Sequence, residues 1–405
     1  MDELDLRRSL AKKSDSKIVL YVIDGVGGLP GAAGLTELQA AKTPNMDALA
    51  VRSACGLHDP VAPGITPGSG PGHLALFGYE PTEHMIGRGA LAAAGIGFPM
   101  QAGDVAMRIN YCSLDDAGNV TDRRAGRIPT EKNEELTPLL RKIKIDGVEI
   151  FVETVREYRS AVVFRPDGGP ELSGNLTDSD SQQTGVPPLA VEALDDESAH
   201  AASVANEFIA KAVAALSGQA PANGILLRGA SGYPTLPTFQ DLYGLSPAAV
   251  ASYPMYRGVA RFAGMEALGI DEIKTFDDEL AVLGKRWSDY DYFFVHYKYT
   301  DSRGEDGDFD AKVAEIEKAD EGLAAILRLE PDVICVTGDH STPSVCKAHS
   351  WHPVPVMLSG DLVRPDGVTE FTELACAGGA LGRCRGKDLM PQMLATAGKL
   401  EKFGA

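Results

Sequence analysis

The sequence lacks the features that mark cysteine zinc sites, exported proteins and membrane proteins. Its six cysteines include no Cys-x-x-Cys pair, and Cys335 lies inside an apolar run, which favours free thiols in a reducing compartment. No apolar run reaches the roughly 20 residues that a bilayer-spanning helix needs. Residues 1–16 are charged and contain no apolar segment of the kind found in signal peptides. We therefore expect a cytoplasmic protein without a membrane partner.

Positive charge is also in short supply. The 405 residues include 38 Lys and Arg against 57 Asp and Glu, and the formal net charge at pH 7 is −19. This balance argues against nucleic acids and anionic membranes as partners. An anionic substrate would need a site that metal ions or clustered arginines make locally positive.

Short apolar runs predict buried strands, and the segments between them predict helices. Thr43-Pro44 has the composition of a helix start, and apolar positions after Phe309 recur with helical spacing. The expected strands are residues 17–23, 291–297, 333–337 and 354–358. Strands that alternate with helices predict an α/β fold with one mostly parallel sheet flanked by helices.

The middle of the chain differs from both ends. It contains Arg-rich strands and turns, a polar tract at residues 173–184 and an Ala-rich helix near residues 198–216. The length also exceeds that of one average domain. We predict a discontinuous sheet domain, residues 1–95 with 236–405, interrupted by a smaller inserted α/β domain over residues 96–235.

Acids and imidazoles follow three of the expected strands. Because parallel strands end on one edge of a sheet, these side chains could converge there and hold two divalent ions. The alternative is a set of capping acids and ordinary loop histidines. The candidate metal ligands are Asp24, Asp301 with Glu305, Asp339 with His340, and His349.

A Gly- and Pro-rich loop at residues 63–72 contains Ser69. With Pro71 at an expected helix start, the Ser69 hydroxyl would lie at a helix N-terminus, where backbone N–H groups stabilise an anion. Ser69 is therefore the candidate nucleophile. The alternative is a flexible loop without a function.

Arginines gather in the predicted insert, with three in the segment 123–127 after Asp122. Guanidinium groups bind carboxylate and phosphate in bidentate fashion. The alternative is a solvated surface patch. The segment 306–317 imitates a calcium loop, but Ala311 stands where such a loop requires glycine. A calcium-binding module is therefore a weaker hypothesis.

Taken together and in order, the motifs resemble those of the cofactor-independent phosphoglycerate mutases. The likeness is to the archaeal-type branch within the alkaline phosphatase superfamily, and it extends from residue 17 to about residue 360. It is carried by Ile23-Asp24-Gly25, Thr66-Pro67-Gly68-Ser69-Gly70-Pro71-Gly72-His73, Arg108-Ile109-Asn110, Asp122-Arg123-Arg124-Ala125-Gly126-Arg127, Leu227-Arg228-Gly229, Tyr253-Pro254-Met255-Tyr256-Arg257-Gly258, Thr300-Asp301, Gly304-Glu305-Asp306-Gly307-Asp308, Gly338-Asp339-His340-Ser341-Thr342-Pro343 and His349-Ser350.

The resemblance implies an alkaline-phosphatase-like domain with two divalent ions and an inserted substrate-binding domain. One ion would be held by Asp24, Ser69, Asp339 and His340, and the other by Asp301, Glu305 and His349. Glu305 stands where the family is expected to have His, and a carboxylate favours manganese or magnesium over zinc or cobalt. The resemblance implies no 2,3-bisphosphoglycerate cofactor.

The implied reaction interconverts 3-phosphoglycerate and 2-phosphoglycerate, in glycolysis and gluconeogenesis, through a phosphoserine at Ser69. Arg257, where many relatives have Lys, would act as a catalytic and substrate-binding cation. Further substrate-binding residues would be Arg108, Asp122, Arg123 and Arg228. The competing hypothesis is a metal-dependent phosphatase or phosphonate hydrolase of the same superfamily, in which water resolves the intermediate. The oligomeric state is left open.

Overall fold

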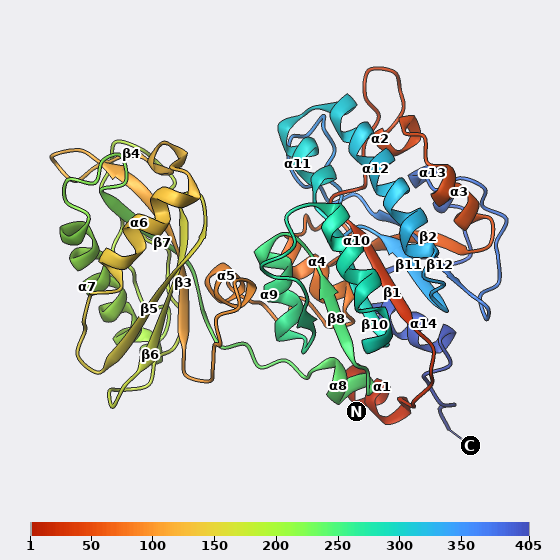
Figure 1. Ribbon diagram of the computed structural model, residues 1–405, viewed down its shortest axis with the longest axis horizontal. Helices are drawn as coiled ribbons and strands as arrows, with labels where there is room; N and C mark the ends of the chain where they lie inside the picture. Colours follow the sequence, from red (N-terminus) through yellow and green to blue (C-terminus); the bar gives the residue numbers. More distant parts are fainter. Residues whose placement is uncertain (1, 405) are drawn as a thin grey trace. The chain divides into compact units, whose positions relative to one another are not determined.

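The computed structural model describes residues 2–404, which form two compact units (Figure 1). One unit comprises Met1–Met85 with Leu236–Ala405, and the other comprises Ile86–Thr235. The second unit begins ten residues before the predicted boundary at residue 96. The reason is helix α5 (Arg88–Gly95), in which Gly89 packs directly on the backbone of Ala106 and Met107.

The first unit is built on an eight-stranded sheet that confirms the predicted mostly parallel α/β fold. Strand β12 pairs antiparallel with both neighbours, and the other neighbouring strands pair in parallel. The order is β13 (Gly382–Arg385), β2 (Ala54–Asp59), β12 (Val354–Gly360), β11 (Val333–Thr337), β1 (Ile18–Ile23), β10 (Tyr292–Tyr297), β8 (Pro247–Val250) and β9 (Glu266–Ala267).

Helices cover both faces of this sheet, which explains why its central strands read as continuous apolar runs. Tyr21 and Phe293 lie in the core that includes residues of α3 (Pro44–Ala50), α10 (Phe276–Lys285) and α12 (Phe309–Leu327). On the opposite face, Phe294 packs on Phe77, next to α4 (Ser69–Leu76), and Tyr292 packs on Phe239 of α8 (Phe239–Tyr243). Helix α9 (Pro254–Phe262) contributes Tyr256, which stacks on His296.

The remaining helical segments of this unit are short. Helix α11 carries Asp301 and Glu305, so these two residues lie on one face of a helix rather than at a strand tip. The segments are α1 (Glu3–Leu10), α2 (Glu37–Ala40), η3 (Trp287–Asp289), α11 (Tyr299–Asp306), α13 (Glu373–Cys376), η4 (Gly386–Asp388) and α14 (Leu389–Thr396).

The second unit is an antiparallel sheet with a helix-covered apolar face. Its elements besides α5 are β3 (Val105–Leu114), β4 (Val120–Asp122), η1 (Ala125–Arg127), α6 (Thr130–Leu140), β5 (Val148–Arg156), β6 (Arg159–Pro166), η2 (Asp196–Ser198), α7 (Ala199–Ala215) and β7 (Gly224–Gly232). Strand β3 pairs with β4, β6 and β7. Alternate residues of β3 from Val105 to Tyr111 pack in one core with residues of α6 and α7, so Arg108 and Asn110 project from the other face.

None of the helices between residues 2 and 404 is long and apolar enough to cross a bilayer.

Candidate functional site

The predicted convergence of acids and imidazoles is present at the carboxyl edge of the parallel strands in the first unit. Asp24 follows β1, Asp339 and His340 follow β11, and Asp301 lies in the first turn of α11. Two groups have ligand atoms that all lie within 4.8 Å of one another. They are Asp24, Asp339 and His340, and Asp301, His340 and His349.

Ser69 joins this cluster as the first residue of α4. Its Oγ lies 3.1 Å from Nε2 of His340. The loop reaches the Asp339-His340 tip because residue 72 is glycine: a Cβ there would lie 2.4 Å from the carbonyl oxygen of Asp339. Gly68 precedes the helix, so no side chain at the N-cap accepts from the first N–H groups of α4. A hydroxyl and an imidazole are thus held in contact near three buried carboxylates.

Two of the buried acids have one oxygen engaged by the protein and one without a hydrogen bond. Oδ2 of Asp24 accepts from the Tyr256 hydroxyl and lies 3.1 Å from Nζ of Lys298, whereas Oδ1 has no hydrogen-bond partner among the described residues. Oδ1 of Asp339 accepts from the Gly25 amide at 3.2 Å, and Oδ2 likewise has no hydrogen-bond partner among the described residues. An unpaired buried carboxylate oxygen is costly. Both free oxygens lie near Nε2 of His340, at 3.3 and 3.2 Å, which fits an oxygen and nitrogen ligand set for a divalent cation.

The second group is more open. Nδ1 of His349 lies 2.9 Å from the carbonyl oxygen of Pro67, which suits an Nδ1–H tautomer with Nε2 left as a ligand. Nε2 of His349 is 3.5 Å from Oδ1 of Asp301 and 3.9 Å from Oε1 of Glu305. The Glu305 side chain is 56% exposed, so the structure brings it beside the cluster rather than into its core.

Burial and neighbouring charges set the protonation of this site. Burial disfavours the ionised form of Asp24, but the charge of Lys298 and the contact with His296 outweigh it and hold the pKa of Asp24 well below its usual range. The pKa of Asp339 is raised well above its usual range, by burial and then by the charges of Asp24 and Asp301. Burial also lowers the pKa of His340 far below that of an exposed imidazole, so its ring is neutral.

The cation beside these acids is not the predicted one. All three hydrogen bonds of the Arg257 guanidinium go to backbone carbonyls, those of Ala251, Ser252 and Ile270. Lys298, which the sequence reasoning missed, instead bridges Asp24 and Asp301. Its signal in the sequence was its position, three residues before Asp301 at the end of an apolar strand.

A cluster of arginines occupies the α5 side of the sheet in the second unit. Arg108 of β3 lies directly opposite Arg228 of β7, and Asn110 lies opposite Arg159 of β6. Since opposed residues project from the same face, the three guanidinium groups share one side. Arg88 reaches it because Gly229 lies against the Arg88 Cβ position, with φ of +60°.

Arg228 pairs with Asp178 and Asp180, and Arg159 lies 4.0 Å from Glu157, but the other two arginines of the cluster have no acidic partner among residues 2–404. Burial, then the charges of Arg88, Arg159 and Arg228, lower the pKa of Arg108 to about 10. Neither Arg88 nor Arg108 forms an ion pair with any acid in the described part of the chain. Nε of Arg108 and Nε of Arg159 are buried without a hydrogen-bond partner there. Unpaired cations grouped together in a protein with a large net negative charge are typical of an anion-binding site.

The other predicted residues of this unit are already engaged. Arg123 forms a bidentate pair with Asp180 at 2.7 and 2.8 Å, and Arg228 lies 3.4 Å from the same carboxylate. Asp122 accepts from the backbone amides of Arg124 and Gly126, so it shapes its own turn. Asp180 belongs to the polar tract at residues 173–184, in which sequence reasoning found no motif.

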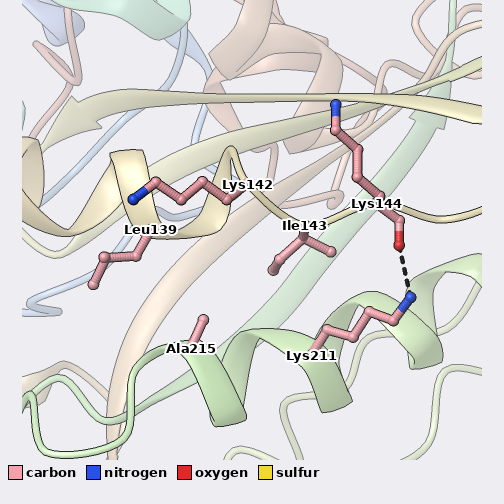
Figure 2. A pocket seen from close by; sticks show the side chains of 6 residues that line it. All are labelled: Leu139, Lys142, Ile143, Lys144, Lys211 and Ala215. Atoms are coloured by element: carbon pink, nitrogen blue, oxygen red, sulfur yellow. Dashed lines mark hydrogen bonds between the residues drawn. The ribbon is translucent and has the colours of Figure 1, made fainter.

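A separate hollow of about 440 Å³ lies between α6 and α7 (Figure 2). It is lined by Leu139, Lys142, Ile143, Lys144, Lys211 and Ala215. Lys211 donates to the carbonyl oxygen of Lys144, as the dashed line in Figure 2 shows, and pairs with Glu207. The hollow is lined by none of the predicted site residues.

The fold and the site define a class: α/β enzymes that present a serine hydroxyl to acids and imidazoles at the carboxyl edge of a parallel sheet. The sequence profile of a family described as 2,3-bisphosphoglycerate-independent phosphoglycerate mutase matches residues 50–223. Proteins named "probable 2,3-bisphosphoglycerate-independent phosphoglycerate mutase" from Thermus thermophilus and Deinococcus radiodurans are each 49% identical to this chain, and each match covers 100% of both sequences.

Solved structures agree. A cofactor-independent phosphoglycerate mutase from Thermoplasma acidophilum superposes with a TM-score of 0.71 and is 30% identical, covering 94% of this chain and 100% of its own. A Pyrococcus horikoshii protein, also 30% identical, has a TM-score of 0.83 and covers 96% of this chain and 99% of its own. The chain belongs to the family of 2,3-bisphosphoglycerate-independent phosphoglycerate mutases, which are isomerases.

Proposed function

We propose that this protein interconverts 3-phosphoglycerate and 2-phosphoglycerate, in glycolysis and gluconeogenesis, through a phosphoserine formed on Ser69. The observation that carries the proposal is the 3.1 Å contact between the Ser69 hydroxyl and Nε2 of His340, within a ring of buried acids. Serine is a weak nucleophile unless its surroundings favour the alkoxide. The free carboxylate oxygens of Asp24 and Asp339 support a metal site at this hydroxyl.

The residues present fit two divalent ions. We assign one ion to Asp24, Ser69, Asp339 and His340, and the other to Asp301, Glu305 and His349, with manganese or magnesium favoured over zinc or cobalt. Bound there, the ions would lower the pKa of the serine hydroxyl and neutralise charge on the phosphoryl group.

The chain's own residues would carry the transfer in two balanced steps. Ser69 Oγ forms a bond to phosphorus as the bond from phosphorus to the glycerate O3 breaks, and the serine proton is passed to O3. Glycerate O2 then forms a bond to phosphorus as the Ser69 Oγ bond breaks, and the proton of O2 returns to Ser69. Lys298, which lies between Asp24 and Asp301, supplies a positive charge near the phosphoryl group.

A mutase, unlike a hydrolase, must retain glycerate between the two steps. We propose that Arg108 and Arg228, together with Arg88 and Arg159, bind the substrate's anionic groups. Support comes from Arg88 and Arg108, which have no acidic partner among the described residues and lie on the same face as Arg228. Arg123 and Asp122 contribute indirectly, the first through Asp180 and the second by shaping its turn.

The proposal is tested by adding 3-phosphoglycerate and manganese to the purified protein, without 2,3-bisphosphoglycerate, and following the products by phosphorus NMR. Appearance of 2-phosphoglycerate, and its loss after removal of manganese by a chelator, would support the mutase assignment. Release of inorganic phosphate without 2-phosphoglycerate would contradict it and favour the hydrolase.

A further inference from the structure

Three buried polar side chains form a continuous chain of hydrogen bonds beside Ser69. Nδ1 of His340 lies 2.9 Å from the Thr342 hydroxyl, and that hydroxyl donates to Oδ1 of Asp301 at 2.8 Å. His340 and Thr342 are 0% exposed and Asp301 is 2% exposed, so water does not compete for these contacts. The chain therefore joins the two groups of candidate metal ligands through one hydroxyl.

The direction of these hydrogen bonds follows from counting protons. A threonine hydroxyl has a single proton, and an ionised carboxylate can only accept. Once Thr342 donates to Asp301, its oxygen can only accept from His340, so Nδ1 of His340 must carry the ring proton. In a neutral imidazole the other nitrogen, Nε2, is then an unprotonated lone pair, and it faces Ser69 Oγ at 3.1 Å.

The opposite tautomer fits the contacts of Thr342 less well. An N–H at Nε2 could donate to Ser69 Oγ at 3.1 Å, whereas its distances to Oδ1 of Asp24 and Oδ2 of Asp339, 3.3 and 3.2 Å, are longer than an ordinary hydrogen bond to a carboxylate. It would also leave Nδ1 as a second acceptor facing Thr342, which has only one proton to give. The 2.8 Å contact to Asp301 would then lose that proton.

Thr342 is itself held rigidly from its backbone. Its amide donates to the carbonyl oxygen of Gly27 at 3.0 Å, and its own carbonyl accepts from the buried Lys312 ammonium at 2.8 Å. Two glycines leave the space it needs, because a Cβ at Gly25 would lie 2.5 Å from the Thr342 hydroxyl and one at Gly304 would lie 2.2 Å from its carbonyl oxygen. Because Thr342 is fixed in this way, its hydroxyl can hold the His340 ring in one orientation.

We propose that Thr342 is a positioning residue that holds His340 as the Nδ1–H tautomer and so keeps Nε2 available to a metal ion beside Ser69. Thr342 also couples His340, assigned to one ion, to Asp301, assigned to the other. The inference rests on the proposed use of His340 and Asp301 as metal ligands. A partner that orients a ligating imidazole contributes roughly 10- to 100-fold to metal affinity.

The test compares wild type with T342V, which keeps the shape but loses the hydroxyl, and with T342S, which keeps the hydroxyl. Protein labelled with nitrogen-15 histidine shows by two-bond proton–nitrogen NMR which ring nitrogen carries the proton, and H340Q assigns the signals. We expect metal-free wild type and T342S to carry the proton on Nδ1 and T342V to lose this preference. Calorimetric titration with manganese should show affinity reduced roughly 10- to 100-fold in T342V and restored in T342S.

Two results would each overturn the inference: a wild-type His340 protonated on Nε2, or a T342V protein that binds manganese as tightly as wild type. The first needs no variant, so it decides even if T342V does not fold. The tautomer is read in metal-free protein without substrate. A protein with the Nδ1–H tautomer that releases only inorganic phosphate would contradict the proposed function and leave the role of Thr342 standing.

Discussion

Arg108 and Arg228 occupy opposed positions of the antiparallel β3–β7 pair, so two cationic side chains project from the same face of the sheet. Like charges placed directly opposite destabilise a sheet. The repulsion between these two arginines lowers the free energy of unfolding of the free protein. A bound anion would relieve it, which is why we place an anionic ligand there.

We expect Arg108→Met to weaken substrate binding without destabilising the protein. It removes a buried, mutually repelled cation, so KM for 3-phosphoglycerate should rise at least about tenfold while the thermal midpoint stays equal or increases. Steady-state kinetics and calorimetry measure the two effects. A lower thermal midpoint with unchanged KM would show that Arg108 is structural.

Arg165→Met is the matched control in the same unit. Arg165 forms a bidentate pair with the buried Asp104 at 2.7 Å, so its loss leaves a carboxylate uncompensated. The expected loss of unfolding free energy is roughly 2–4 kcal/mol, with KM unchanged.

We expect Ser69→Ala to lower kcat by at least about 10⁴-fold while the fold is retained. The Ser69 side chain is partly exposed and its hydrogen bond goes to His340, so little packing is lost. Turnover is followed by the phosphorus NMR assay, and folding by circular dichroism. Retained turnover in a folded variant would exclude Ser69 as the nucleophile.

We expect Glu305→Ala to lower bound manganese from two ions towards one. Glu305 lies 3.9 Å from His349 and one helical turn after Asp301, both assigned to the second ion, so the ion near Ser69 should remain. Metal content after gel filtration measures the stoichiometry. Glu321→Ala, an exposed acid on α12, is the control, and an unchanged content in Glu305→Ala would remove Glu305 from the ligand set.

His58 should make the stability of the first unit depend on pH. Burial lowers the pKa of His58 to about 4, whereas the unfolded chain takes up this proton near its ordinary value of 6.5. Between these pH values the unfolded state binds more protons than the folded state. The free energy of unfolding is therefore unaffected by His58 above about pH 6.5 and decreases as the pH drops, by about 2 kcal/mol at pH 5.

His58→Gln should remove this part of the pH dependence. Nε2 of His58 lies 3.1 Å from the carbonyl oxygen of Gly338, and a glutamine amide can donate there without titrating. Urea unfolding at pH 7.5 and pH 5 measures the difference, with His84→Gln as the control. If the free energy of unfolding falls by the same amount between pH 7.5 and pH 5 in wild type and in His58→Gln, the prediction is wrong.

Local sequence features were sufficient for the sheet and for the convergence of the acids and imidazoles at its edge. Continuous apolar runs predicted β1, β10 and β11 because strands buried on both faces need apolar side chains at every position. The acids and imidazoles after those runs marked the carboxyl edge, and Pro71 marked a helix start that places Ser69 at the N-terminus of α4.

Other features depend on contacts between distant segments, which no local pattern contains. Arg257 was expected near the reacting group, but the start of α9 directs its guanidinium to the carbonyls of Ala251, Ser252 and Ile270. Lys298 was overlooked because a lysine after a strand is ordinary until two acids from β1 and α11 are seen around it. Asp180 escaped notice because a polar tract does not reveal which arginine it pairs with.

By itself, the sequence determined the fold class, the Gly- and Pro-rich loop that contains Ser69, and the acids and imidazoles that gather at the carboxyl edge of the sheet. It did so because burial and backbone geometry constrain neighbouring positions in the chain. Only the tertiary structure decided which oxygen of each acid is free, which cation stands beside Asp24 and which hydroxyl contacts each ring nitrogen of His340. Those properties are set by hydrogen bonds between segments up to several hundred residues apart, where a shift of about 1 Å changes the partner.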